Sequence, residues 1–201
     1  MSSQQSQEIA ATAARLVVEE GLEYGPAKQR AVRQLGLGRQ ADLPDNDELE
    51  DQVRDYLALF CADTQPAELA ALRSLAAVWM ERLAEFRPHL TGAVWRGTAT
   101  RLSNIHLQLF CDDSKSAEIG LINQGVDYEV GSATVRGKQI DVLGLSVLCR
   151  ELGEPVILQL SILDHDDLRG ALKPDSRGRS ERGDLAALRQ LIKKEEEHEQ
   201  P

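Results

Sequence analysis

The sequence predicts an α+β fold in which a helical region precedes a small mixed or antiparallel sheet. Up to about residue 88, apolar residues recur at helical spacing in four successive segments. Beyond that point, apolar and polar residues alternate, or apolar residues form short runs, as is typical of strands. A last amphipathic segment near the end of the chain predicts one more helix. Helices first and strands later indicate an α+β domain behind a helical region.

Composition favours a protein with a real core. The chain has 201 residues, of which 42% are hydrophobic and 28% are charged, which allows one domain or two small ones. It contains no apolar run long enough to span a membrane, and residues 1–20 lack the hydrophobic core of a signal peptide. We therefore expect a cytoplasmic protein without a membrane partner.

Cysteines and net charge narrow the function classes further. Cys61, Cys111 and Cys149 are scattered and odd in number, which indicates a reducing compartment and small buried side chains rather than a disulfide framework or metal site. The formal net charge of −10 argues against broad, nonspecific binding of nucleic acid. A local basic patch stays compatible with it.

Four helices are expected in the first 88 residues. They cover residues 7–20 before Gly21, 26–35 before Gly36, 45–61 after an N-cap at Asp45, and 64–86 before Pro88. The second carries Lys28, Arg30 and Arg33, with Arg39 just beyond it. A basic second helix after a turn is similar to a helix-turn-helix reader of nucleic acid. A solvated helical face is the simpler interpretation of the same charges.

The stretch at residues 92–110 is the most informative part of the chain. Its first half is rich in glycine and small residues, which suits a tight turn or the close approach of a ligand. Its second half alternates strictly, with one face formed by Ile105, Leu107 and Leu109 and the other by Asn104, His106 and Gln108. This pattern predicts a hairpin of two strands joined by a glycine turn, with a polar face beside the turn.

That stretch resembles the signature of the polymerase-β-like nucleotidyltransferases, in particular the small bacterial ones. The family pattern is Gly-Ser, then Arg-Gly-x-Ala, then Ser-Asp-Ile-Asp-Leu. Gly92 matches the first glycine, Arg96-Gly97-Thr98-Ala99 the turn, and Ser103-Asn104-Ile105-His106-Leu107 the strand. The resemblance covers roughly residues 89–163 and implies a nucleotidyltransferase-like α+β domain at 89–172, between a helical region at 1–88 and a polar linker with a helix at 173–201.

The resemblance also implies a set of site residues. Those expected to contact a nucleotide are Gly92, Ala93, Arg96, Gly97, Thr98 and Ser103, with the Arg96 guanidinium as the best-placed phosphate donor. The metal positions are Asn104, His106, Asp127 and Glu129, of which Asp127 stands where the family carries its last carboxylate and is the candidate catalytic residue. Ala93 replaces the family's serine, and Asn104 and His106 replace its two aspartates.

Those replacements bear directly on catalysis. Nucleotidyl transfer needs divalent ions, and Mg²⁺ prefers carboxylate oxygens. We therefore expect a degenerate nucleotidyltransferase-like protein that binds a nucleotide or a protein partner without efficient catalysis. Two alternatives stay open: an active enzyme that uses Mg²⁺ or Mn²⁺ at an atypical site, and a non-catalytic adaptor that acts through its helical region.

The rest of the chain completes the expected sheet. The remaining elements are a helix from Asp113 or Ser114 to 123, strands at 126–130, 134–149 with a bulge at Gly144, and 156–163, a short helix that residues 164–167 open, a linker at 173–183 and a helix that begins at Asp184. The last helix is expected to dock on its own domain, to bind a protein partner or to pair with a second copy.

Overall fold

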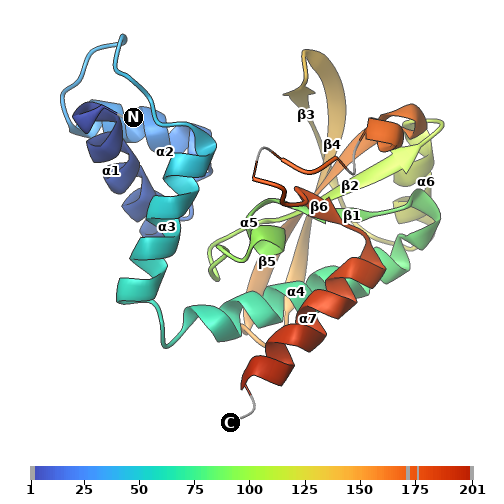
Figure 1. Ribbon diagram of the computed structural model, residues 1–201. Helices are drawn as coiled ribbons and strands as arrows, with labels where there is room; N and C mark the ends of the chain where they lie inside the picture. The colour runs from blue at the N-terminus through green and yellow to red at the C-terminus, as the bar shows by residue number, and fades with distance from the viewer. Residues whose placement is uncertain (1–2, 171–172, 176, 200–201) are drawn as a thin grey trace. The chain divides into compact units, whose positions relative to one another are not determined.

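The computed structural model describes residues 3–170, 173–175 and 177–199 (Figure 1). The chain forms two compact units, a helical unit of Met1–Glu68 with Thr98–Ser103, and a sheet unit of Leu69–Gly97 with Asn104–Pro201. In this grouping the division falls after Glu68, whereas the sequence suggests one at residue 88. Most of the fourth expected helix is grouped with the strands, as is the segment at 173–201; residue 176 of the expected linker lies outside the described residues.

The helical unit is built from α1 (Gln4–Glu20), α2 (Tyr24–Gln34) and α3 (Asn46–Phe60). Gly21 and Gly36 follow the first two helices with φ angles of 68° and 66°, the left-handed conformation that suits glycine at a helix end. Asp45 and Glu48 form a reciprocal capping box at the start of α3. The three expected helices and their C-terminal ends are thus confirmed, while α1 begins at Gln4 and α2 at Tyr24, a few residues earlier than predicted. Apolar side chains from all three helices form the core of this unit: Ile9, Ala13, Ala14, Leu16, Val18, Ala27, Ala31, Leu49, Val53 and Leu57.

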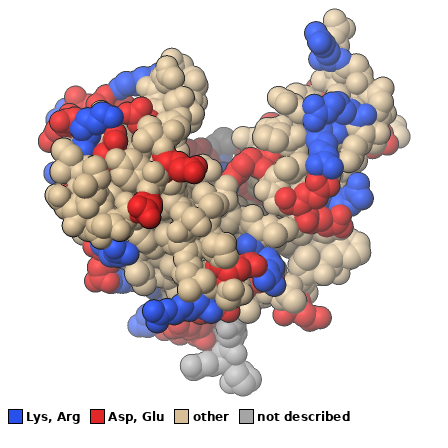
Figure 2. Space-filling view, turned by 180° about the vertical axis from the view of Figure 1, so that it is seen from behind, with Lys and Arg blue, Asp and Glu red and all other residues tan. Residues whose placement is uncertain are grey.

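The basic residues of α2 lie on the surface of the helical unit. Figure 2 shows a band of Lys and Arg on this unit, with Asp and Glu beside it. Arg30 pairs with Glu20 at 2.5 Å, and the Lys28 ammonium donates to the Asn46 side-chain oxygen at 2.8 Å. Both cations therefore have neutralising or polar partners within the unit, as expected of a solvated helical face.

The sheet unit contains six strands within the described residues. Their order is β3-β4-β5-β2-β1-β6, and β2 pairs with β5 in parallel while every other neighbouring pair is antiparallel. The α+β class and the mixed sheet are thus as predicted. The elements are α4 (Gln65–Arg82), η1 (Ala84–Phe86), β1 (His89–Thr91), α5 (Gly92–Arg96), β2 (Ile105–Cys111), α6 (Lys115–Asn123), β3 (Glu129–Val135), β4 (Lys138–Cys149), β5 (Glu154–Asp164), η2 (His165–Gly170), β6 (Arg182–Gly183) and α7 (Leu185–Glu199).

Two expectations about the first strands need correction. β1 and β2 pair antiparallel, with Leu90 opposite Leu107, so the predicted pairing is correct. The connection is not a simple glycine turn, because Gly92 at φ 72° opens the short helix α5. A helix of five residues is too short to leave a periodic pattern in the sequence.

The long strand expected at 134–149 is two strands. Arg136 and Gly137, with φ angles of 50° and 77°, form a two-residue turn that pairs Val135 with Lys138. Positive φ at both positions is the signature of a type I′ hairpin turn. Gly144 sits in an unbroken register between Glu129 and Gln159, so the predicted bulge there is wrong. The strand expected at 126–130 begins only at Glu129, and Asp127 precedes it.

The segment expected to be a linker contributes a strand. Within β6, Arg182 lies opposite Thr91 and Gly183 opposite Leu90 of β1. Asp184 then caps α7, since its carboxylate accepts the Ala187 N–H at 2.8 Å, as predicted. The polar segment before α7 therefore forms the last edge of the sheet.

The central strands have one apolar face. Leu107, Leu109, Leu158 and Leu160 are buried on it, and it forms the main core of the unit. Cys111 and Cys149 are buried as expected, and burial raises the pKa of the Cys111 thiol. Of the helices described, none combines the length and apolarity needed to cross a membrane.

Candidate functional site

The opposite face of the central strands carries a group of half-buried polar side chains. They come from β2, the residue just before it, and its parallel neighbour β5: Asn104, His106, Gln108, Gln159 and Ser161, called the polar ledge below. His106 lies level with Gln159, and Gln108 with Ser161. Because facing residues of adjacent strands point to the same side, these amides, hydroxyl and imidazole form one surface. It is the polar face that the alternation at 104–109 predicts.

The backbone of Gly92 lies close to His106 of this ledge. It lies next to Thr91, which is opposite His106 in the sheet. A Cβ atom added at Gly92 would stand 3.3 Å from Cδ2 of His106, and φ at this residue is 72°. Both the conformation and the space therefore favour glycine. The structure thus brings together two of the expected site residues, Gly92 and His106, while Ala93 follows in the first turn of α5.

The turn that follows α5 is held by an arginine that sequence reasoning missed. Arg73 of α4 is only 2% exposed, and its Nε and Nη2 donate to the carbonyls of Val94 and Trp95 at 2.9 and 3.0 Å. Gly97 ends α5 at φ 87°, where an added Cβ would lie 3.5 Å from Nη2 of Arg73. The sequence carried a signal, because Arg73 follows Leu69 and Leu72 on the apolar side of α4. Arg96 is half-buried in the last turn of α5.

Thr98 and Ser103 belong to the loop 98–103 of the helical unit. The Ser103 hydroxyl accepts the Thr100 N–H at 2.9 Å, so it stabilises a turn of that loop. Thr98 is buried, and its hydroxyl has no hydrogen-bond partner among the described residues. Both of these expected site residues therefore lie in this loop, where Ser103 has a structural role.

The two expected carboxylate ligands, Asp127 and Glu129, are not brought to Asn104 and His106. Glu129 aligns with His106 across Gly144 and Gln159, which puts it three strands away, or roughly 14 Å at the usual strand spacing. Asp127 lines a groove of about 740 Å³ together with Trp79 and Arg150. Ligands of one ion must all lie within about 2.6 Å of it. Over the residues that the structure describes, no group of three or more His, Cys, Asp or Glu could hold a metal.

A small basic pocket adjoins the polar ledge at Gln108. It has a volume of about 180 Å³, and the polar residues that line it are Gln108, Arg136, Lys138, Asp167 and Arg182. Arg182 is 9% exposed, and its Nη1 donates to the side-chain oxygen of Gln108. Burial lowers the pKa of Arg182 and Arg136 nearby lowers it further, while the Glu181 carboxylate opposes the shift; a guanidinium stays charged at neutral pH. The sequence indicated only a linker arginine at this position.

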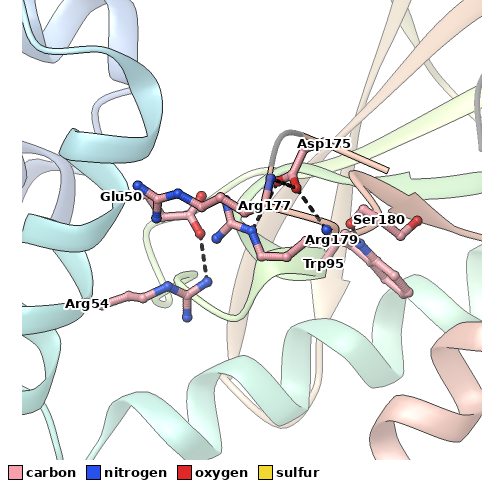
Figure 3. A network of polar contacts seen from close by, with 7 residues as sticks. All are labelled: Glu50, Arg54, Trp95, Asp175, Arg177, Arg179 and Ser180. Carbon is pink, nitrogen blue, oxygen red and sulfur yellow. Dashed lines mark hydrogen bonds and ion pairs between the residues drawn. The ribbon is translucent and has the colours of Figure 1, made fainter. Parts of the chain in front are cut away.

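Arg182 belongs to a strap formed by Asp175 and residues 177–183, of which Figure 3 shows Asp175, Arg177, Arg179 and Ser180. The Asp175 carboxylate accepts the backbone N–H groups of Arg177 and Arg179 at 2.9 and 2.8 Å and the Nε of Arg179 at 3.0 Å. Farther along, the indole N–H of Trp95 donates to the Ser180 carbonyl at 2.8 Å. A turn at one end and an indole at the other therefore fix the strap.

The Asp175 turn should depend on pH. The backbone N–H of Arg179 makes the largest contribution that lowers the pKa of Asp175. Since the folded value lies below the unfolded one, the turn is fully stabilised above about pH 3.9 and loses this stabilisation as pH falls through the lowered pKa. We expect the amide chemical shifts of Arg177 and Arg179 to titrate with a midpoint below that of an unfolded aspartate.

The same turn can be tested at neutral pH by proteolysis. Asp175→Asn should raise the rate of tryptic cleavage after Arg177 and Arg179 several-fold, on the order of the local opening that one charged hydrogen bond prevents. Asp166→Asn, at an exposed carboxylate of η2, is the matched control. Equal cleavage rates for the wild-type chain and Asp175→Asn would contradict the role given to this carboxylate.

Comparisons with family models, with curated proteins and with solved structures find no match for this chain. The resemblance to nucleotidyltransferases therefore depends on the residues quoted for it, most of all those from Gly92 to Leu107. What the site can bind is indicated by the geometry of the polar ledge and the pocket beside it.

Proposed function

We propose that this chain binds a nucleotide over the polar ledge, without efficient nucleotidyl transfer. The observation that supports the proposal is the ledge itself, a half-exposed polar surface on the strand where the transferase-like pattern places its aspartates. Asn104 and His106 occupy those positions. Amide and imidazole groups can hydrogen-bond a base or a ribose, but they do not provide the carboxylate pair that two Mg²⁺ ions need.

The surroundings of the ledge are consistent with an anionic ligand. Gln108 belongs to both the ledge and the basic pocket, and its side chain contacts the buried guanidinium of Arg182. A nucleotide has an uncharged base and sugar joined to charged phosphates. The neutral polar ledge suits the base and sugar, and the basic pocket next to it suits the phosphates.

An active transferase has less support from the geometry. The candidate carboxylates Asp127 and Glu129 lie before and on β3, with β4 and β5 between them and β2. They could assist a reaction at His106 only after the sheet was rearranged. Binding without turnover requires no such rearrangement.

Self-association through the helical unit is a second candidate function. Leu59 and Phe60 at the end of α3 are 76% and 69% exposed, although the Phe60 ring contacts Tyr56, with ring centroids 4.6 Å apart. Exposed neighbouring apolar side chains of this size are typical of contact surfaces. If this surface joins two copies, the double substitution Leu59→Ser and Phe60→Ser should shift the sedimentation profile toward the monomer. A monomeric wild-type chain would exclude it.

Calorimetric titration tests the nucleotide proposal. We expect saturable binding of at least one of ATP, GTP, CTP and UTP, with little dependence on Mg²⁺ or Mn²⁺. His106→Ala and Gln159→Ala should each weaken binding by about tenfold, the effect of one hydrogen bond to a ligand. Ser132→Ala, on the exposed strand β3, is the control. Absence of heat with a folded sample, or equal affinities in all variants, would contradict the proposal.

A complementary variant tests the position of the ledge. Changing Asn104→Asp and His106→Asp together restores the carboxylate pair of the family pattern. We expect the variant to gain affinity for Mg²⁺, because two carboxylates on one strand face can coordinate a divalent ion. No gain in Mg²⁺ affinity would mean that this strand face is not a metal site.

A further inference from the structure

The basic pocket holds more positive charge than its own residues neutralise. Three cations, Arg136, Lys138 and Arg182, line it with a single carboxylate, Asp167. Lys138 already pairs with Asp164. Within the described residues, Arg182 forms no ion pair, and its side-chain partner is the neutral amide of Gln108. The guanidinium is nine-tenths buried. The Glu181 carboxylate favours its charge without pairing with it directly, so Arg182 lacks the paired counter-ion that usually accompanies a buried cation.

The backbone conformation of the turn that contains Arg136 also indicates a functional role for this pocket. Arg136 has φ 50°, a left-handed conformation that residues other than Gly, Asn and Asp rarely adopt. The first position of a type I′ turn strongly favours Asn or Gly. An arginine there is unfavourable for the turn, and such local strain is often associated with function. Its side chain lines the pocket that Arg182 enters from the opposite edge of the sheet.

The volume of the pocket limits what it can hold. At about 180 Å³ it is smaller than the range of roughly 300–1,000 Å³ typical of whole-ligand sites. It therefore suits a charged part of a ligand whose remainder lies outside it. The neighbouring polar ledge, reached through Gln108, offers the surface for that remainder.

We infer that the pocket of Arg136, Lys138 and Arg182 is the subsite for the phosphate groups of a nucleotide. Arg182 offers N–H donors from a fixed, buried position, and planar guanidinium groups bind phosphate oxygens in pairs. The inference rests on the proposed nucleotide binding, because it names where the phosphates of that ligand lie. The sequence suggested Arg96 as the phosphate donor, whereas this inference assigns that role to Arg136, Lys138 and Arg182 at the other edge of the ledge.

The test uses the full chain without added metal, titrated calorimetrically with inorganic pyrophosphate and with ATP. Arg182→Gln and Arg136→Asn should each weaken both ligands by at least about tenfold, the usual effect of losing a charged hydrogen bond. Arg150→Ala, in the turn beyond the far end of β4, is the matched control and should leave both affinities unchanged. Arg96→Ala should leave pyrophosphate affinity unchanged as well.

A second measurement, the melting temperature, distinguishes a specific loss of phosphate binding from misfolding of the variant. Arg136→Asn places the preferred residue in the type I′ turn, so it should raise the melting temperature while it lowers phosphate affinity. A merely structural arginine would not separate the two effects in this way. Wild-type affinity for pyrophosphate and ATP in Arg136→Asn and Arg182→Gln would overturn the inference.

The outcomes separate the subsite from the proposed function. Pyrophosphate binding that needs Arg182, with ATP bound no more tightly, would support the subsite as a phosphate site and contradict nucleotide binding. ATP binding that is unchanged by Arg182→Gln would support nucleotide binding and overturn the subsite. No binding of either ligand to the folded chain would overturn both.

Discussion

Replacing Arg73 by methionine is expected to lower the free energy of unfolding of the sheet unit by about 3–5 kcal/mol, the usual effect of breaking a buried charged network. The substitution keeps the apolar stem but removes the bonds to the Val94 and Trp95 carbonyls. These carbonyls are at the end of α5, where no helical N–H can reach them. Glu195 of α7 also loses its partner, so the substitution removes polar contacts that join α4 to both α5 and α7. Urea unfolding followed by circular dichroism measures the change.

Two controls identify the source of that loss. Glu195→Gln should lower the stability by no more than about 1 kcal/mol, because Glu195 is half-exposed and water replaces part of the ion pair. Arg189→Ala, which breaks an exposed pair with Glu81, should be close to neutral. A loss below about 1 kcal/mol in Arg73→Met would contradict the view that Arg73 holds α5 in place.

Replacing Gly183 by alanine is expected to destabilise the sheet unit by about 1–3 kcal/mol through overpacking. The new Cβ would stand 2.2 Å from Cη2 and 2.4 Å from Cζ3 of the Trp95 ring, far inside contact distance. The ring cannot move without releasing its bond to the Ser180 carbonyl. We therefore expect β6 to loosen from β1, which both lowers the urea midpoint and displaces Arg182 from the basic pocket.

A glycine in another strand provides the comparison. At Gly131 of β3 an added Cβ would be 3.7 Å from the Val142 carbonyl oxygen, an ordinary contact, so Gly131→Ala should be nearly neutral. Trp95→Leu should partly relieve the clash in Gly183→Ala, giving a favourable coupling in a double-mutant cycle. Additive losses in that cycle would show that the ring and the glycine do not constrain each other.

The elements that the sequence predicted well have local causes. The caps at Gly21, Asp45 and Asp184 and the alternation at 104–109 depend on residues within a few positions of one another. The polar ledge was partly foreseen for the same reason, since Asn104, His106 and Gln108 mark it by themselves. Its other half, on β5, required the parallel pairing of β2 with β5, which no local pattern specifies.

What the sequence did not predict depends on distant partners or on atypical residues. β6 is two residues long and exists through its pairing with β1, so composition indicated a linker. The turn at Arg136 was hidden because arginine is not a usual residue for that conformation. Arg73 and Arg182 are buried charges, and a charged residue in a sequence is ordinarily expected on the surface. The basic pocket is assembled from such positions.

Amide chemical shifts recorded while ATP is added to the isotope-labelled full chain locate the ligand directly. The proposed function predicts that the largest changes occur at His106, Gln108 and Gln159 on the ledge, and the phosphate subsite adds Arg136 and Arg182. Inorganic pyrophosphate should shift the pocket residues and leave His106 unaffected. Shifts confined to the helical unit, or no shifts at ATP concentrations in the millimolar range, would contradict a nucleotide site on this face of the sheet.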